Sequence, residues 1–151
     1  MVSPKLIIGL LIFILSIHIL ATIYYWYWTV SWLDMPMHFL GGFWVAMAYF
    51  WLRQKTRINA DQDADKRGYI SSALPTIVGC LSFVALVGVL WEFSEFFYDI
   101  FISVKGYSGI AQQGVADTMS DLFFDLLGGI VFLVIYKFHL KIRQNEDHFL
   151  G

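Results

Sequence analysis

The chain has 151 residues, of which 58% are hydrophobic and 15% charged, with a formal net charge of −2, whereas soluble domains are roughly 45–50% hydrophobic and about 25% charged. Its mean hydropathy is +0.64. These values exclude a disordered chain, a nucleic-acid-binding protein and an ordinary soluble domain, and they predict an integral membrane protein.

Four apolar segments are each long enough to cross a bilayer as a helix, which takes about 20 residues. In chain order, the predicted helices are 6–28, 35–53, 73–101 and 117–138. These segments are about twice as long as the strands of a membrane barrel, so helices are the structure we expect. The prediction is one all-α transmembrane domain over residues 1–151, a four-helix bundle with a loop at 54–72 and a short tail at 139–151.

The basic residues predict the orientation of this bundle. Lys105 is the one Lys or Arg on one side of a four-span chain, and the opposite side carries Lys5, Arg53, Lys55, Arg57, Lys66, Arg67, Lys137, Lys141 and Arg143. Loops rich in Lys and Arg stay in the cytoplasm. We therefore predict a protein of the cell membrane, plasma or inner, with both termini in the cytoplasm.

Acidic residues gather near the outer ends of the predicted helices: Asp34, Glu92, Glu95, Asp99, Asp117, Asp121 and Asp125. Spacings of three or four residues place the acids of each segment on one helix face, and glycines share these faces. Small residues let helices pack closely, and ionisable groups inside a membrane mark a functional site by default. The acids are therefore predicted to face the interior of the bundle.

The central candidates for this site are His38, Glu92, Glu95, Asp121 and Asp125. Such close groups cannot all remain ionised without compensation. Either some carboxyl groups are protonated, or one divalent cation (magnesium, manganese, calcium or zinc) is bound by these five residues. In an enzyme, Glu92 or Glu95 is a candidate base and His38 a candidate acid.

Three other acids have a structural alternative. Asp34 and Asp117 each stand where a helix N-cap is expected, and Asp99 can lie in solvated helix above the membrane. They are secondary candidates for the site. His18, alone in the first helix, is expected to be a hydrogen-bonded core residue.

The segments 34–42, 91–96 and 112–128 resemble the VanZ-like and YjdF-type small membrane proteins. The matching residues run Asp-Met-Pro-Met-His-Phe with two glycines, then Trp-Glu-Phe-Ser-Glu-Phe, then Gln-Gln-Gly leading to Asp-Thr-Met-Ser-Asp. The resemblance spans residues 34–129 and adds Gln112 to the secondary candidates. It implies a multi-helix membrane protein without a settled reaction, in a group with some links to glycopeptide-antibiotic tolerance. Val115 and Ala116 stand where that group carries a further acid, and Asp125 is an additional acid here.

Three functions remain open at this stage. One is a cation-dependent enzyme that acts on a lipid-linked or envelope substrate at the outer membrane face. The second is a non-catalytic membrane binding or scaffold protein. The third is a proton or cation transporter, which the apolar inner halves of the helices disfavour. The expected partners are the lipid bilayer and a lipid headgroup or envelope component, with no nucleic acid; the sequence does not fix the oligomeric state.

Overall fold

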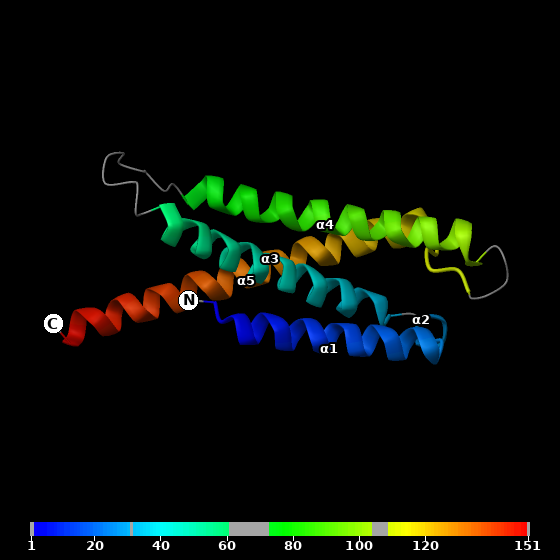
Figure 1. Cartoon of the computed structure of the whole chain (residues 1–151), viewed down its shortest axis with the longest axis horizontal. Coiled ribbons are helices and arrows are strands. Elements are labelled where there is room, and N and C mark those ends of the chain that lie inside the picture. Colours follow the sequence, from blue (N-terminus) through cyan, green and yellow to red (C-terminus); the bar gives the residue numbers. More distant parts are fainter. Residues whose placement is uncertain (1, 31, 61–72, 104–108, 151) are drawn as a thin grey trace.

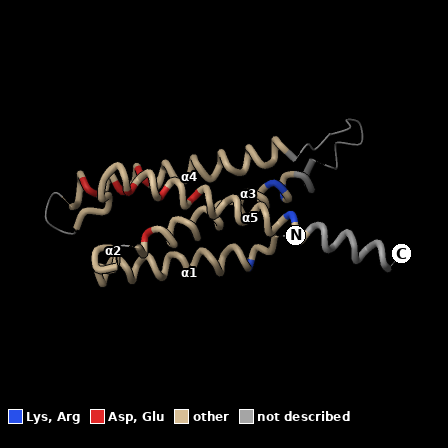
Figure 2. Tube along the Cα trace, turned by 180° about the vertical axis from the view of Figure 1, so that it is seen from behind, with Lys and Arg blue, Asp and Glu red and all other residues tan. Residues whose placement is uncertain are grey.

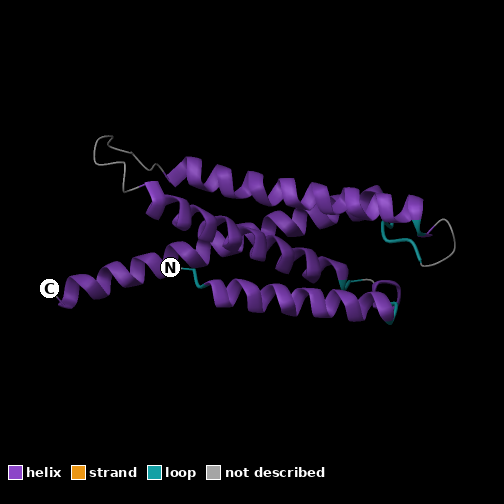
Figure 3. Cartoon of the chain, in the orientation of Figure 1, coloured by secondary structure: helices purple, strands orange, loops and turns teal. Residues whose placement is uncertain are grey.

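The computed structural model describes residues 2–30, 32–60, 73–103 and 109–150, with the backbone alone described for 57–60 and 140–150. Within these residues the fold is all helical (Figure 3). The helices are α1 (Pro4–Ile23), α2 (Trp26–Thr29), α3 (Asp34–Ala60), α4 (Ala73–Phe101) and α5 (Val115–Leu150). The predicted all-α class is thereby confirmed.

Three stretches are long and apolar enough to cross a membrane, judged by length and composition: Pro4–Ile23, Leu74–Phe101 and Val115–His139. They correspond to α1, α4 and the first part of α5. Helix α3 has 27 residues, which suffices in length, but its first turns carry Asp34, His38 and two glycines that lower its hydropathy. The structure therefore supports a membrane protein with several apolar helices.

Helix α3 occupies the centre of the molecule. It lies between α1 and α4 and is crossed by α5 (Figure 1), and it packs against all three. Helices α1, α4 and α5 expose many large apolar side chains along their lengths, whereas the exposed ones described on α3 are Met35 and Leu52, near its two ends. Protein rather than lipid therefore surrounds most of α3.

The contact between α3 and α5 depends on glycine. A Cβ atom on Gly42 would lie 1.9 Å from the backbone oxygen of Asp125, and one on Gly128 would lie 2.0 Å from the backbone oxygen of Phe39. Any other residue at either position would push the two helices apart. Gly128 lies on the predicted acidic face of its helix and allows the close packing expected there. On α3 the close contact is made by Gly42, whereas Gly41, which shares a face with Asp34 and His38, would place a Cβ at an ordinary 3.8 Å from Asp125.

The apolar core fills the half of the bundle that lies away from the acids. Its buried members include Val45, Met47 and Phe50 of α3, Val84 of α4 and Phe132 of α5. The rings of Phe50 and Phe132 are 5.6 Å apart, centre to centre. This core holds three helices in register beneath the acidic end.

Helix α4 matches the predicted range 73–101, whereas the other three long helices start one or two residues early and end far from the predicted residue. The first helix ends at Ile23 rather than 28, because Tyr25 adopts a left-handed backbone (φ 56°) that turns the chain into α2. Helix α3 continues through residues 54–60 of the predicted loop, and α5 runs through most of the predicted tail. Lys, Arg and Gln favour the helical conformation. The first charged residues after an apolar segment therefore indicate where the membrane ends, but not where the helix ends.

Candidate functional site

Opposite charges lie at opposite ends of the bundle. Figure 2 shows the acidic residues near the start of α3, the end of α4 and the start of α5, and the described basic residues at the other end. The described basic side chains are Lys5, Arg53, Lys55 and Lys137. Arg53 donates to the hydroxyl of Thr76, so it too is engaged far from the acids. Within the described residues, the acidic end therefore lacks a Lys or Arg counter-charge.

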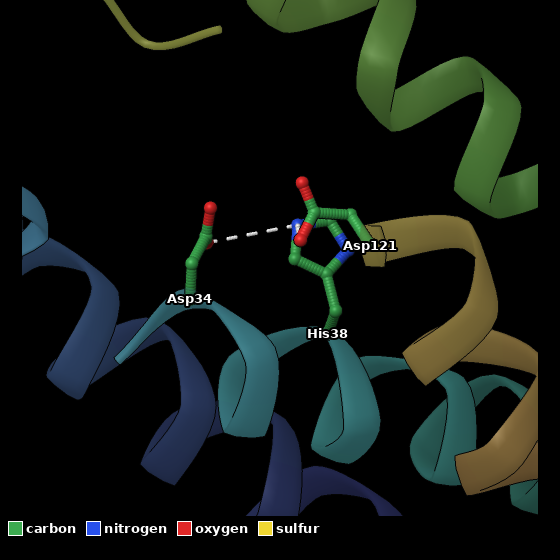
Figure 4. Close-up of side chains that lie close together, drawn as sticks. All are labelled: Asp34, His38 and Asp121. Atoms are coloured by element: carbon green, nitrogen blue, oxygen red, sulfur yellow. Dashed lines mark ion pairs between the residues drawn. The ribbon is translucent and has the colours of Figure 1, made fainter. Parts of the chain in front are cut away.

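His38 stands at the centre of the acidic end. Its Nε2 atom lies 3.7 Å from Asp34 Oδ1 and 3.9 Å from Asp121 Oδ1. Figure 4 shows the two carboxylates near the imidazole, Asp34 one turn before His38 on α3 and Asp121 on α5. One ligand atom from each of the three residues lies within 4.8 Å of the others. Two helices thus bring one nitrogen and two oxygen donors close enough to share a metal ion.

Asp125 contacts the other nitrogen of the same imidazole. His38 Nδ1 donates to Asp125 Oδ2 over 3.4 Å, and both side chains are buried. Gly88 of α4 leaves the space for this carboxylate, because a Cβ there would lie 2.5 Å from Asp125 Oδ2. Asp125 was predicted as a metal ligand. The structure places its carboxylate on the side of His38 away from Asp34 and Asp121, where it holds the ring in orientation.

Glu92 completes the buried part of the cluster from α4. Gln112 donates from Nε2 to Glu92 Oε2 (3.3 Å) and to Thr118 Oγ1 (3.0 Å). The carboxylate is close enough to Asp34 and Asp121 to interact with each electrostatically. Gln112, a secondary candidate, therefore belongs to the cluster as a partner of Glu92.

Two buried oxygen atoms of the cluster have no hydrogen-bond partner among the described residues, Glu92 Oε1 and Asp121 Oδ2. Glu92 is 5% exposed and Asp121 is 1% exposed. A buried polar atom left unpaired costs about 1–3 kcal/mol, and more when it is charged. These oxygens are therefore free to bind a cation or to carry a proton.

Asp99 and Asp117 serve the chain that precedes α5 instead. The Asp99 carboxylate accepts the backbone N–H groups of Ala111 (2.7 Å) and Gln112 (2.9 Å), besides the hydroxyl of Ser103. Asp117 lies in the first turn of α5 and accepts the backbone N–H of Gln113 (3.0 Å). It is not the N-cap, because the helix begins two residues earlier, at Val115. Asp99 fixes the position of Gln112 and so supports the cluster indirectly, whereas Asp117 holds the neighbouring Gln113.

Glu95 lies in a groove between α1 and α4, which His38 also lines. Its Oε1 accepts the indole N–H of Trp91 over 2.9 Å. The same groove contains His18, whose Nδ1 is 2.8 Å from the Tyr27 hydroxyl. Burial, followed by the carboxylates of Asp34 and Glu95, raises the pKa of Tyr27 above its ordinary value, so the hydroxyl keeps its proton. His18 is thus hydrogen-bonded, as expected, but it lines a cavity.

Sequence reasoning missed the part that Tyr27 and Trp91 play in this groove. Tyr27 lies in a run of aromatic residues at the end of the predicted first helix, and such side chains are common at the membrane surface. The break at Tyr25 directs its ring back toward α1. The left-handed backbone of a tyrosine carries no signal in a single sequence, so the groove could not be predicted from it.

Residues 2–142 match the family described as "Predicted membrane protein (DUF2238)". The chain belongs to this family. No curated protein and no solved structure matches it. The family match supports the predicted membrane class and a family without an assigned activity, and it does not show the resemblance to the VanZ-like and YjdF-type proteins.

Proposed function

We propose that the chain is a four-span protein of the cell membrane, with α3 as the fourth span and both termini in the cytoplasm. The central position of α3 supports this proposal, since a helix covered by protein can cross the bilayer at lower hydropathy. The separation of charge along the bundle supports the orientation, because the basic end would face the cytoplasm. The acidic end then lies beneath the outer leaflet.

The acidic end is proposed to bind one divalent cation through Asp34, His38 and Asp121, with Glu92 as a further ligand. The two unpaired oxygens, Glu92 Oε1 and Asp121 Oδ2, carry this proposal, because an ion would satisfy both. A set of carboxylates with one imidazole accepts magnesium, manganese, calcium or zinc, and the imidazole favours manganese or zinc. His38 would present Nε2 to the ion while Asp125 holds Nδ1, an arrangement common among metal-binding histidines.

Such an ion would make the protein a cation-dependent enzyme acting on a lipid-linked or envelope substrate. The ion supplies a Lewis acid or activates water, and Glu92 or Glu95 is the base available beside it. The resemblance to VanZ-like and YjdF-type proteins, some linked to glycopeptide-antibiotic tolerance, agrees with an envelope substrate.

A second candidate, a non-catalytic binding or scaffold protein, is favoured by one observation. His38 contacts carboxylates from both α3 and α5, so the cluster also fixes the register of the two helices. Transport is disfavoured, because below Asp125 the described core consists of apolar residues such as Val45, Val84 and Phe132.

Divalent-ion binding to the full chain, purified in an uncharged detergent, tests the proposal. The purified protein is analysed for bound metals, stripped with a chelator and titrated with manganese and zinc. Asp121→Asn removes a ligand charge with little change of shape. We expect affinity to fall by roughly 100-fold or more, beyond the ~10–100-fold typical of an outer-shell partner.

Asp117→Asn is the matched control, since it removes the same charge one turn earlier on α5. Its effect should stay below about 5-fold, because a more distant charge acts through a longer and more solvated path. Circular dichroism and gel filtration verify that both variants fold. A folded wild-type protein that retains and binds neither metal contradicts the proposal, and so do equal losses in the two variants.

A further inference from the structure

A groove runs between α1 and α4. Its floor is α3, and it consists of two cavities of about 160 Å³ and about 500 Å³. Both cavities are lined by the same five residues, which shows that they adjoin: His18, Tyr27, Asp34, Trp91 and Glu95. The groove is therefore continuous from the outer end of the bundle toward its middle.

The inner cavity is lined mostly by apolar side chains, and its polar lining residues include His38 and Asp125 of the acidic cluster. Leu11, Ile14 and Leu15 of α1 face Val84 and Val87 of α4. Both helices are long and apolar enough to span a membrane, and this cavity lies along their membrane portions. An alkyl chain from the bilayer matches such a lining, because apolar walls offer no partner to water.

The outer cavity is lined by aromatic rings and carboxylates. Its aromatic members are Tyr25, Tyr27, Trp28, Trp91 and Tyr98. Asp34 and Glu95 add negative charge, and among the described residues that line the two cavities there is no Lys or Arg. Aromatic faces beside carboxylates form the sites that recognise ammonium groups, through cation–π attraction and direct charge attraction.

Hydrogen bonds hold the walls of the outer cavity in place. Trp91 donates to Glu95, which fixes the carboxylate against the indole ring. Trp28 donates from Nε1 to the backbone oxygen of Ile110 over 3.2 Å, and its ring stacks on Tyr25 with centres 5.5 Å apart. The arrangement of rings is thus set before a ligand enters, which lowers the cost of binding.

We propose that this groove binds an amphiphile with a cationic ammonium headgroup, which lies in the outer cavity, and one hydrocarbon chain, which lies in the inner cavity. An anionic headgroup would meet two carboxylates, and the described lining residues include no Lys or Arg to balance them. The inference deepens the proposed function by naming the class of its substrate, and it rests on that function for the placement beside an ion. Binding itself requires only the groove.

Native mass spectrometry of the full chain in an uncharged maltoside detergent tests the proposal. The probe is dodecyltrimethylammonium. Its two comparators are tetramethylammonium, which lacks the chain, and an uncharged dodecyl polyether, which lacks the charge. We expect one bound probe per protein, with each comparator at least about 10-fold weaker, as expected when a cation–π contact or an apolar contact is lost.

Glu95→Gln removes the headgroup charge partner and keeps the side-chain shape, and Trp91→Leu removes an aromatic wall. Each should weaken probe binding by about 10-fold, in line with the loss of one desolvated cation contact. Phe93→Leu is the matched control, since Phe93 lies on the same helix with 54% of its surface exposed, outside both cavities. It should leave probe binding unchanged.

The proposal is overturned if the polyether binds as tightly as the probe, if tetramethylammonium does so, or if Glu95→Gln and Trp91→Leu match the control. The two proposals fail separately. Asp121→Asn should lose the metal ion and still bind the ammonium probe, whereas Glu95→Gln should lose the probe and still bind the ion. If the protein binds the probe but binds no metal, this inference holds and the proposed cation-dependent enzyme is contradicted.

Discussion

The two sides of α3 are built in opposite ways. On one side α5 approaches so closely that Gly42 and Gly128 touch the opposite backbone. On the other, α1 and α4 stand apart and leave the groove lined by Trp91 and Glu95. Lipid tails are as apolar as the side chains of the helices, so hydrophobicity alone does not bring two helices into contact. The comparison teaches that the positions of glycines decide which helices of this bundle pack closely and which leave a groove between them.

Gly42→Ala should disrupt the close contact between α3 and α5, and it should have the largest effect. The added Cβ would meet the backbone of Asp125 at 1.9 Å, and since backbone cannot step aside, the helices must separate. We expect a loss of about 3 kcal/mol in the free energy of unfolding, the upper part of the usual range for overpacking. Reversible unfolding in mixed micelles measures it.

Gly9→Ala is the control for this substitution. No atom lies within 4 Å of the Cβ that it would add, so we expect a gain of about 0.5–1 kcal/mol from helix propensity. An equal loss in both variants would show that glycine flexibility, and not the approach of α5, explains the result.

Gly88→Ala should have the next largest effect, and this effect concerns the candidate site itself. Its Cβ would lie 2.5 Å from Asp125 Oδ2, so the carboxylate must leave His38. We expect the affinity for manganese or zinc to fall by about 10-fold, as for other losses of an outer-shell partner. Titration with these ions, as above, provides the measurement.

Gly41→Ala is the matched variant for this test. It would place its Cβ 3.8 Å from the other oxygen of Asp125, an ordinary contact, and should leave the affinity within about 2-fold of wild type, since nothing must move. Similar losses at both glycines would contradict the positioning role of Asp125.

Trp44→Phe should have the smallest effect and act on the open side. The indole of Trp44 on α3 donates to the backbone oxygen of Ile7 on α1 over 2.9 Å. Phenylalanine keeps an aromatic ring at this position and removes the hydrogen bond to Ile7, which is worth about 1 kcal/mol. Faster amide hydrogen exchange near the start of α1 is the expected result, and Trp32→Phe, at a residue 64% exposed, should not produce it.

The sequence predicted the helices better than their ends. Runs of apolar residues reveal a span because the bilayer has a fixed thickness, and α4 was found with its full range. The continuation of α3 beyond Arg53 was missed. A change from apolar to charged residues indicates the edge of the membrane, but charged residues can continue the helix beyond that edge. The turn at Tyr25 was missed because packing around Tyr27, and no local preference, stabilises it.

The candidate site was predictable where residues repeat every three or four positions. That spacing gathered His38, Glu92, Asp121 and Asp125 correctly into one buried group. It also included Asp99, which points instead to the backbone of Ala111 and Gln112. Spacing fixes which face of a helix a residue occupies, but the partner on that face depends on the path of the connecting chain.

The shared backbone contact of α3 and α5 has a mechanical consequence. Asp34, His38 and Asp121 come from these two helices, and α1 contributes none of them. A sideways displacement of α1 would widen the entrance for a molecule arriving from the bilayer while the distances around the imidazole stay constant. If the two proposals hold, uptake from the lipid phase would therefore not disturb the bound ion.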